Sequence, residues 1–396
     1  MTLDFIGGEP LLEAELIDKI CDYFKLQTYL KGSSWFWNYR ISICTNGVNY
    51  SSEKVQHLIE KNPGKIGITI TVDGTKEKHD LQRVFPDGSG SYDVIKANIE
   101  LWKKQFVAST KVTFASDDLK YLKDSIIELW NEGIHDIAAN VVYEDVWKEG
   151  DDKIFEDQLK LLADYILEND LFNKYSCSLF DETIGAPYNE ELLKETCCGA
   201  GKMLALGVDG KIYPCMRYCA YSLNNKEPLD IGDVDNGINF DKVRPFETVT
   251  YKLQSDNECL NCPIATGCGF CQGFNYDVAD TYTNFQRAKY ICKMHKARVR
   301  ANNYYFAKLY NLYDIERDSG YAHESRTINF LLSDNHVSCC MGVNSSAEVS
   351  EEKLMSKDAI FEGLKYAEQH FYKPVFIHSK TGNTIINYDK FNEYRI

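Results

Sequence analysis

The hydrophobic and polar positions of the first 145 residues follow two alternating patterns. Short apolar runs of strand length are separated by longer stretches whose apolar residues repeat at the spacing of one helix face. The predicted strands are Leu3–Ile6, Arg40–Cys44, Ile66–Val72, Lys111–Ala115 and Asp136–Val142. The predicted helices between them are Leu11–Leu30, Ser52–Lys61, Tyr92–Phe106 and Leu119–Asn131. Alternation of strand and helix favours an α/β fold with a parallel sheet or barrel.

The turns after these strands are the first candidates for function, because active residues of such folds lie where the strands end. They are 7–10, 45–47 and 73–83. In the first predicted helix, one face carries apolar residues at helical spacing, namely Leu12, Leu16, Ile20 and Tyr23.

The pattern changes after residue 145 and divides the rest of the chain into three parts. A charged break is followed by a predicted linker helix, Lys153–Glu168, within residues 146–195. Residues 196–300 are irregular and rich in cysteine, and residues 301–396 form a C-terminal extension. The extension starts with a helix whose aromatic face we expect to pack in the core, and continues as a small α/β segment. These predictions rest on Phe306, Leu309, Tyr310 and Tyr313 for the helix face, and on Thr327–Leu332 and Lys373–His378 for strands flanking a second helix.

Composition and charge exclude several classes of protein. The 396 residues are 44% hydrophobic, so the chain can bury substantial cores. With 59 acidic against 44 basic residues, the net charge of −15 argues against nucleic acid as the main partner. No apolar run reaches membrane-spanning length and no signal peptide is recognisable, so we expect a cytoplasmic protein without a membrane partner.

Fourteen cysteines are unusual for a reducing compartment, where structural disulfides are rare. Eight of them lie between Cys197 and Cys271, and this clustering favours metal ligation. Other cysteines are expected to be small buried hydrophobic residues: Cys21, Cys44, Cys177 and the adjacent pair Cys339 and Cys340.

The spacing of the clustered cysteines indicates whether they bind an iron–sulfur cluster or zinc. Cys198 is followed by eleven residues, Gly210, four residues and Cys215, in a segment that predicts a hairpin with Asp209–Gly210 at its turn. Farther on, the spacing is Cys259-x2-Cys262-x5-Cys268-x2-Cys271. Twenty residues then separate Cys271 from Cys292. A zinc ribbon separates its cysteine pairs more widely, so five residues favour iron–sulfur ligation over zinc, which stays the alternative.

This cysteine pattern resembles the SPASM domain of radical S-adenosylmethionine (SAM) maturases of peptides and proteins. The order matches throughout, although the family pattern has three residues where this chain has two between Cys268 and Cys271. The resemblance covers about residues 1–300. It implies a partial (β/α)6 radical SAM barrel lacking its first strand, then an Fe–S SPASM domain and a small α/β extension.

The resemblance also implies two auxiliary [4Fe–4S] clusters. The first is expected on Cys198, Cys215 and Cys271, with a fourth position taken by Cys219, by Cys197 or left open for a substrate thiolate. The second is expected on four further cysteines, namely Cys259, Cys262, Cys268 and Cys292.

Three turns match the SAM-binding motifs of this family. Gly7-Gly8-Glu9-Pro10 matches the motif that grips the ammonium group of SAM, and Thr45-Asn46-Gly47 matches the motif after the next strand. The stretch from Thr71 to Arg83 resembles the family sequence S-x-D-G followed by H-D-x-x-R, with Thr replacing Ser. The residues expected to bind SAM are Gly7, Gly8, Glu9, Pro10, Thr45, Asn46, Thr71, Asp73 and Arg83. Arg83 is expected to pair with the SAM carboxylate, and an ion pair at a helix cap is the alternative.

The defining family motif, C-x3-C-x2-C, does not occur in the chain. In the family it follows a first strand, and only five of the six barrel strands are recognisable here. We therefore expect the missing strand, loop and helix to precede Met1, through a misassigned start or a fragmentary gene. The alternative is a family member that has lost the motif. A third, SAM-binding [4Fe–4S] cluster is then expected only in the full-length protein, and this polypeptide alone is expected to be inactive.

The resemblance implies a maturase that uses a 5′-deoxyadenosyl radical to modify a ribosomally made, Cys-containing precursor peptide. A thioether cross-link is the expected product, and flavodoxin or ferredoxin the expected electron donor. The alternatives are a sulfatase-type maturase that makes formylglycine, a non-catalytic Fe–S protein that binds peptide or transfers electrons, and a zinc-stabilised binding module.

Overall fold

The computed structural model describes residues 1–280, 282, 286–317, 327–331 and 355–377. Contacts divide the chain into two compact units. Unit 1 comprises Met1–Val142 and Val146–Phe180, and unit 2 comprises Tyr143–Asp145 and Asp181–Ile396. The finer division at residues 145, 195 and 300 stays a prediction. Cys339 and Cys340 lie outside the described residues.

Unit 1 is built on parallel strands in two small sheets, with strand orders β1-β2-β3 and β4-β5-β6. The strands are β1 (Thr2–Phe5), β2 (Arg40–Thr45), β3 (Ile66–Ile70), β4 (Ser109–Phe114), β5 (Asp136–Val141) and β6 (Ser176–Cys177). The first five lie where the sequence predicts them. The two residues of β6 are too few to show a periodicity, so the pattern misses this strand. The α/β class is confirmed, and the partial barrel stays a prediction because the sheets do not close.

A threonine side chain joins the two sheets of unit 1. The Thr110 hydroxyl on β4 donates to the Ile70 carbonyl at 2.9 Å and accepts from the Val72 amide at 3.0 Å. It therefore bridges β3 and β4, which belong to separate sheets and do not pair through a backbone ladder.

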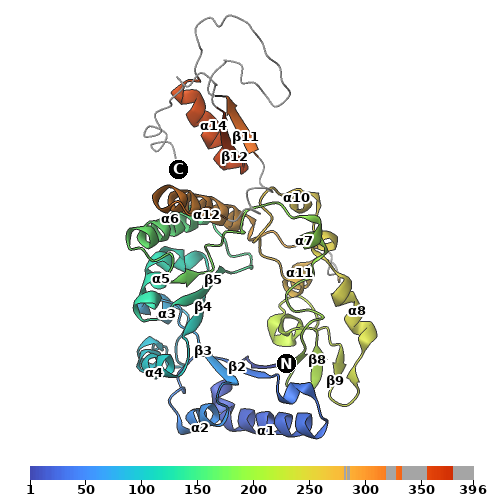
Figure 1. The fold of residues 1–396 in the computed structure, drawn as a ribbon. Helices are drawn as coiled ribbons and strands as arrows, with labels where there is room; N and C mark the ends of the chain where they lie inside the picture. Colours follow the sequence, from blue (N-terminus) through green and yellow to red (C-terminus); the bar gives the residue numbers. More distant parts are fainter. Residues whose placement is uncertain (281, 283–285, 318–326, 332–354, 378–396) are drawn as a thin grey trace, which may run out of the picture. The chain divides into compact units, whose positions relative to one another are not determined.

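Helices cover one side of these strands (Figure 1). They are α1 (Ala14–Leu30), α2 (Glu53–Lys61), α3 (Lys76–Asp80), α4 (Tyr92–Gln105), α5 (Leu122–Asn131) and α6 (Asp151–Glu168), with short 3-10 turns η1 (Pro10–Glu13), η2 (Ser34–Phe36) and η3 (Ser116–Tyr121). Alternate strand residues, such as Ile41 and Ile43 on β2, are buried in the core. Cys44, which follows Ile43, is exposed, so the prediction that it is a buried thiol is wrong.

Helix α1 buries Ala14, Ile17 and Cys21, which are smaller on average than its exposed apolar residues. The conspicuous apolar face identified in the sequence is instead exposed, at 67, 51, 40 and 65% for Leu12, Leu16, Ile20 and Tyr23. The periodicity therefore predicted the helix correctly without identifying its buried side.

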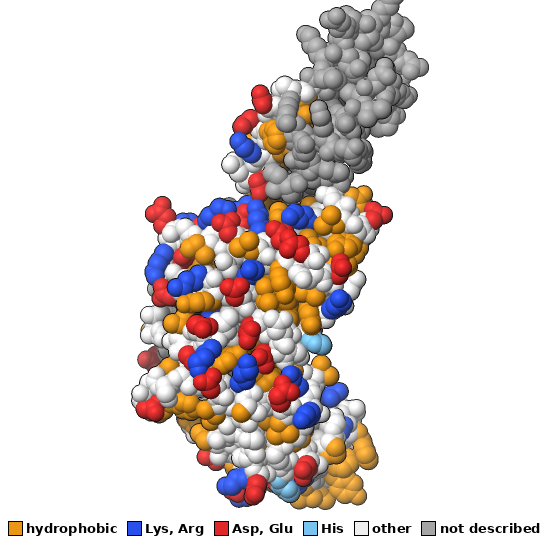
Figure 2. Space-filling model, turned by 90° about the vertical axis from the view of Figure 1, so that its left-hand side faces the viewer, with side chains coloured by type: hydrophobic (Ala, Val, Ile, Leu, Met, Phe, Trp, Pro, Cys, Tyr) orange, Lys and Arg blue, Asp and Glu red, His pale blue; other side chains and the backbone are white. Residues whose placement is uncertain are grey.

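Charged side chains of both signs lie intermingled over the helical face seen in Figure 2. Several form surface ion pairs within unit 1: Lys61 with Asp18 and Asp22, Lys103 with Glu100, and Lys153 with Asp157. Such exposed pairs each contribute at most about 1 kcal/mol to stability. Their mixture of signs shows that the net negative charge does not form one uniform acidic surface here.

Unit 2 contains a small antiparallel sheet of order β10-β9-β8-β7. Its strands are β7 (Ala205–Leu206), β8 (Lys211–Tyr213), β9 (Gly232–Asp233) and β10 (Gly237–Ile238). The predicted hairpin is confirmed, since β7 and β8 pair across Asp209–Gly210. The 3-10 turns η4 (Met216–Tyr218) and η5 (Ala220–Ser222) follow. The longer elements are α7 (Glu190–Lys194), α8 (Phe240–Thr248), α9 (Tyr251–Gln254), α10 (Asn257–Leu260), α11 (Gln272–Val278) and α12 (Cys292–Tyr313).

The C-terminal extension has the predicted strand–helix–strand order. Strands β11 (Thr327–Leu331) and β12 (Lys373–Ile377) pair in parallel, with α14 (Lys357–His370) between them in sequence. On α12, Leu309 is buried but Tyr310 and Tyr313 are exposed, so the predicted aromatic core face is only partly correct. In the part of the chain that is described, no helix is both long and apolar enough to cross a bilayer.

Candidate functional site

The first candidate site in unit 1 is the turn that follows β1. Gly7 and Gly8 have φ of +87° and +56°, a left-handed conformation that residues with a Cβ rarely adopt. This turn places Glu9 so that its carboxylate accepts from the Leu11 amide at 3.0 Å and thereby caps the 3-10 turn at Pro10.

The same carboxylate links the turn to the end of β2. Glu9 accepts from the Thr45 hydroxyl at 2.5 Å and from the Asn46 amide at 2.7 Å. Thr45 in turn accepts from the Gly47 amide at 3.0 Å, and Gly47 lies against Ile70 so closely that a Cβ would come within 2.5 Å of it. The structure thus brings together two of the predicted motifs, which lie 36 residues apart between Glu9 and Thr45.

The third motif begins where β3 ends. The Thr71 amide donates to the Thr45 carbonyl at 2.9 Å, which places this motif beside the second. Asp73 is buried, and its carboxylate pairs with the Arg83 guanidinium. The predicted ion pair of Arg83 with a SAM carboxylate is not tested by this geometry.

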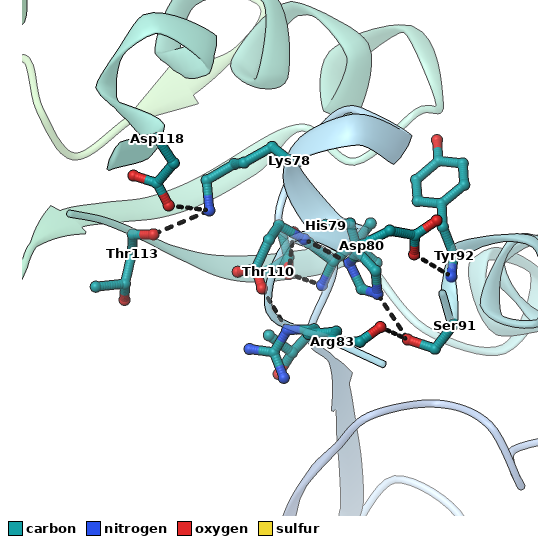
Figure 3. A network of polar contacts seen from close by, with 12 residues as sticks. Lys78, His79, Asp80, Arg83, Ser91, Tyr92, Thr110, Thr113 and Asp118 are labelled. Carbon is teal, nitrogen blue, oxygen red and sulfur yellow. Dashed lines mark hydrogen bonds and ion pairs between the residues drawn. The ribbon is translucent and has the colours of Figure 1, made fainter. Parts of the chain in front are cut away.

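His79 fixes the loop that carries Asp73 and Arg83 (Figure 3). Its Nδ1 accepts from the Asp73 amide at 3.2 Å, which leaves the ring proton on Nε2 to donate to Ser91 Oγ at 3.1 Å. Ser91 then donates to the Arg83 carbonyl at 3.0 Å. Burial lowers the pKa of His79 to about 4, so the ring is neutral and this direction of hydrogen bonding is maintained at neutral pH.

Neighbouring residues anchor the same loop to the rest of unit 1. Asp80 accepts from the Tyr92 amide at 3.0 Å, at the start of α4. Lys78 is buried, donates to the Thr113 carbonyl at 3.0 Å and pairs with buried Asp118 at 3.3 Å (Figure 3). The sequence analysis missed Lys78, because a single lysine beside a motif has no spacing signal of its own.

The first cysteine group in unit 2 consists of Cys198, Cys215 and Cys271. Cys215 ends the hairpin segment, and the Arg217 amide donates to its sulfur at 3.3 Å. The pKa of the Cys215 thiol is raised to about 12, chiefly by burial. A smaller part of this shift comes from three nearby thiols, those of Cys271, Cys197 and Cys198.

A fourth thiol accompanies this group. Cys197 is buried, and it affects the pKa of Cys271 as well as that of Cys215. The Ala200 amide donates to its sulfur at 3.2 Å. For Cys219, burial raises the pKa, and the neighbours that affect it are Tyr221 and Asp209 rather than the thiols of this group. Of the alternatives that the sequence leaves open, these contacts favour Cys197 over Cys219.

The second cysteine group consists of Cys259, Cys262, Cys268 and Cys292. All four line one cavity of about 400 Å³ within unit 2. Short helices position two of them, since Asp256 caps α10 by accepting from the Cys259 amide at 2.9 Å, and Cys292 begins α12. Burial raises the pKa of Cys259 to about 12 and that of Cys262 and Cys268 in the same direction.

The chemistry of both groups fits iron–sulfur ligation. Their cysteines are free thiols, the second group surrounds a volume suited to a multi-iron cluster, and thiolates are the ligands such clusters require. Among the described residues, no three His, Cys, Asp or Glu side chains converge tightly enough to hold a single metal ion. Burial disfavours the free thiolates, so cluster iron would supply the positive charge that stabilises them.

Comparison with known proteins finds similarity to radical SAM enzymes, although no family model matches the chain. The radical SAM cyclopropyl synthase TigE of Paramaledivibacter caminithermalis is 21% identical over 312 residues, which cover 76% of this chain and 60% of TigE. A cysteine-type anaerobic sulfatase-maturating enzyme of Clostridium perfringens is 24% identical over 322 residues, which cover 74% of this chain and 78% of that enzyme.

Solved structures agree on the fold. The structure of anSMEcpe with bound AdoMet has a TM-score of 0.56 at 19% identity and covers 82% of this chain and 83% of its own. Its complex with AdoMet and the Cp18Cys peptide has a TM-score of 0.55 at 20% identity, over 78% and 85% of the two chains. The predicted resemblance to radical SAM maturases of the SPASM type is confirmed.

Proposed function

We propose that this chain belongs to a radical SAM maturase that modifies a ribosomally made, Cys-containing peptide. The observation that carries the proposal is the convergence of four cysteines, spaced as in a SPASM domain, on one cavity in unit 2. Support for a peptide substrate comes from anSMEcpe, whose structure contains a bound peptide together with AdoMet.

In this proposal unit 1 binds SAM and unit 2 holds two auxiliary [4Fe–4S] clusters. The turn of Gly7, Gly8, Glu9 and Pro10 contacts the ammonium group, with Thr45, Asn46 and Thr71 beside it. Asp73 holds the Arg83 guanidinium, and Arg83 pairs with the SAM carboxylate. The first cluster binds the first cysteine group with Cys197 as the fourth ligand, and the second binds the second cysteine group.

The proposed product is a thioether bond, and its chemistry explains the need for auxiliary clusters. SAM, when bound to a reduced cluster of its own, supplies a 5′-deoxyadenosyl radical that takes a hydrogen atom from the substrate. Joining a C–H carbon to a thiol sulfur also releases one proton and one electron. An acceptor for that electron is required near the peptide, and an auxiliary cluster in unit 2 is of the right chemical class.

A sulfatase-type maturase is the second candidate, favoured by the similarity to the enzyme from Clostridium perfringens. The two reactions differ in the fate of sulfur. Thioether formation keeps the substrate sulfur and removes two hydrogens, whereas formylglycine formation replaces the sulfur of Cys by oxygen. Mass spectrometry of a treated Cys-containing peptide therefore distinguishes them.

Metal analysis of the anaerobically prepared full chain tests the proposal directly. We expect about eight iron and eight sulfide per chain, with electron paramagnetic resonance signals of two clusters after reduction. Zinc without sulfide would contradict the proposal and support a zinc-stabilised module.

A second measurement separates catalysis from simple electron transfer. Because the chain has no C-x3-C-x2-C motif, we expect both clusters to assemble but no 5′-deoxyadenosine to form from SAM and dithionite. Formation of 5′-deoxyadenosine at rates above the protein-free blank would show that the motif is dispensable here.

A further inference from the structure

The cavity of the second cysteine group contains a cation that belongs to none of the recognised motifs. Arg287 lines this cavity together with Cys259, Cys262, Cys268 and Cys292. It lies in the irregular segment between Cys271 and Cys292, where the sequence pattern gives no reason to single out one basic residue.

The Arg287 guanidinium is held in place from several sides. Its Nη1 donates to Ser255 Oγ at 3.2 Å, and its Nη2 donates to the Gly269 carbonyl at 3.4 Å. The guanidinium also lies over the Phe270 ring, 5.3 Å from its centroid. A planar cation with this many partners has a defined orientation, which a freely rotating surface arginine lacks.

This guanidinium lies close to the second cysteine group. Burial raises the pKa of Cys259, Cys262 and Cys268, and the positive charge of Arg287 lowers it in each case. Cys268 immediately precedes Gly269, whose carbonyl accepts from Arg287, so the guanidinium anchors the backbone next to this cysteine.

The other ionisable groups around the cavity are engaged differently. Lys289 forms ion pairs with Asp256 at 2.6 Å and Glu258 at 2.8 Å, which offset its charge. Buried His295 lies 2.6 Å from the Ile264 carbonyl through Nε2, and burial lowers its pKa to about 4, so it is neutral. Lys296 lies near Cys262. Arg287 donates to the Gly269 carbonyl, directly beside Cys268.

Such a cation favours the reduced state of a cluster. Four thiolates make a [4Fe–4S] cluster anionic, and reduction adds one more negative charge. A fixed positive charge beside the ligand sulfurs stabilises the more negative state more strongly, and the charge around a cluster is an established means of tuning its potential.

We propose that Arg287 is a positioning residue that orients Cys268 and raises the reduction potential of the second auxiliary cluster. The inference rests on the proposed function only in requiring a cluster on these four cysteines. In a reaction that releases an electron from the substrate, a higher potential makes this cluster the better acceptor of the two.

The test compares the wild-type full chain with R287Q, R287K and the exposed control R244Q, whose arginine pairs with Asp241 on α8. Each protein is reconstituted anaerobically and titrated with dithionite, with each cluster followed by electron paramagnetic resonance. In R287Q we expect full iron content and an equilibrium constant for reduction of the second cluster that is about tenfold lower, or 59 mV for a one-electron couple. R287K keeps the charge without the planar fork, so its shift should be smaller, and R244Q should match the wild type.

An unchanged potential in fully loaded R287Q would overturn the proposal. If R287Q loses its iron, R287K decides the matter: a small negative shift supports the proposal, and no shift or a positive one contradicts it. Failure of the proposed function itself is visible separately, as absence of iron and sulfide from the wild-type protein.

Discussion

The two candidate sites are organised by opposite means. In unit 1 the polar side chains bind one another: Glu9 binds Thr45 and the Asn46 amide, and Asp73 binds Arg83. In unit 2 the four thiols of the second cysteine group surround a cavity, and burial raises the pKa of Cys259, Cys262 and Cys268. One site satisfies its own polar groups, whereas the other is chemically incomplete without a cationic ligand.

This difference indicates how each unit depends on its ligand. Unit 1 can hold the geometry of these turns without a ligand, because its carboxylates already have hydrogen-bond partners. In unit 2 most of the thiols, among them Cys259, Cys262 and Cys268, lie in short helices and turns, so cluster binding is expected to supply part of the folding free energy. Variants in the two units should therefore fail in different ways.

The largest expected effect is in unit 2, where C268S removes one ligand of the second cysteine group. We expect iron to fall from about eight to about four per chain and the thermal stability of unit 2 to fall with it. The matched control is C44S, since Cys44 is an exposed thiol in unit 1. Equal iron content in C268S and the wild type would exclude Cys268 as a ligand.

The next largest effect is the pH dependence that His79 gives to the stability of unit 1. The folded pKa of His79, about 4, lies below the value near 6.5 of an unfolded histidine, so the unfolded chain binds the proton more readily. The stability from neutral His79 is thus complete above about pH 6.5 and is lost as the pH falls towards 4, to a total of up to about 3 kcal/mol.

Denaturant titrations at several pH values, with unit 1 followed by hydrogen exchange, measure this contribution. The difference in unfolding free energy between wild type and H79Q should shrink as the pH falls from 6.5 to 4. H57Q, at an exposed histidine on α2, is the control. A difference that stays constant with pH would show that His79 is not held neutral.

The smallest effect is expected from E9Q. The glutamine amide keeps one accepting oxygen but places an NH2 group where the carboxylate accepts a backbone amide. One buried donor loses its partner, so we expect unit 1 to lose about 2 kcal/mol of unfolding free energy. E13Q, one turn farther on, should change it by less than about 0.5 kcal/mol. Equal losses in E9Q and E13Q would argue against a structural role for the Glu9 contacts.

Most elements of unit 1 could be predicted from the sequence because each has enough residues to show a period. The strands from β1 to β5 are examples. In unit 2 the hairpin of β7 and β8 was predictable from its Asp209–Gly210 turn instead. Two kinds of feature could not. The strand β6 is too short for any pattern, and the exposed face of α1 has the same periodicity as a buried one.

Contacts between residues far apart in the chain could not be predicted from the sequence either. The motifs predicted that Glu9, Thr45 and Asp73 belong to one site, but their spacing says nothing about which atoms bind. Lys78 and Arg287 were missed altogether, since each is a single residue whose role depends on partners from other elements.

The sequence by itself determined the chemistry available to this protein: the α/β pattern, the SAM-type turns and the cysteine spacing that favours iron–sulfur ligation. Local order along the chain is enough for these, because turns and short ligand spacings involve neighbouring residues. Only the tertiary structure decided that Cys259, Cys262, Cys268 and Cys292 share a cavity with Arg287, and that Asp73 holds Arg83. Burial and charge depend on what packs around a side chain, and folding alone brings those neighbours together.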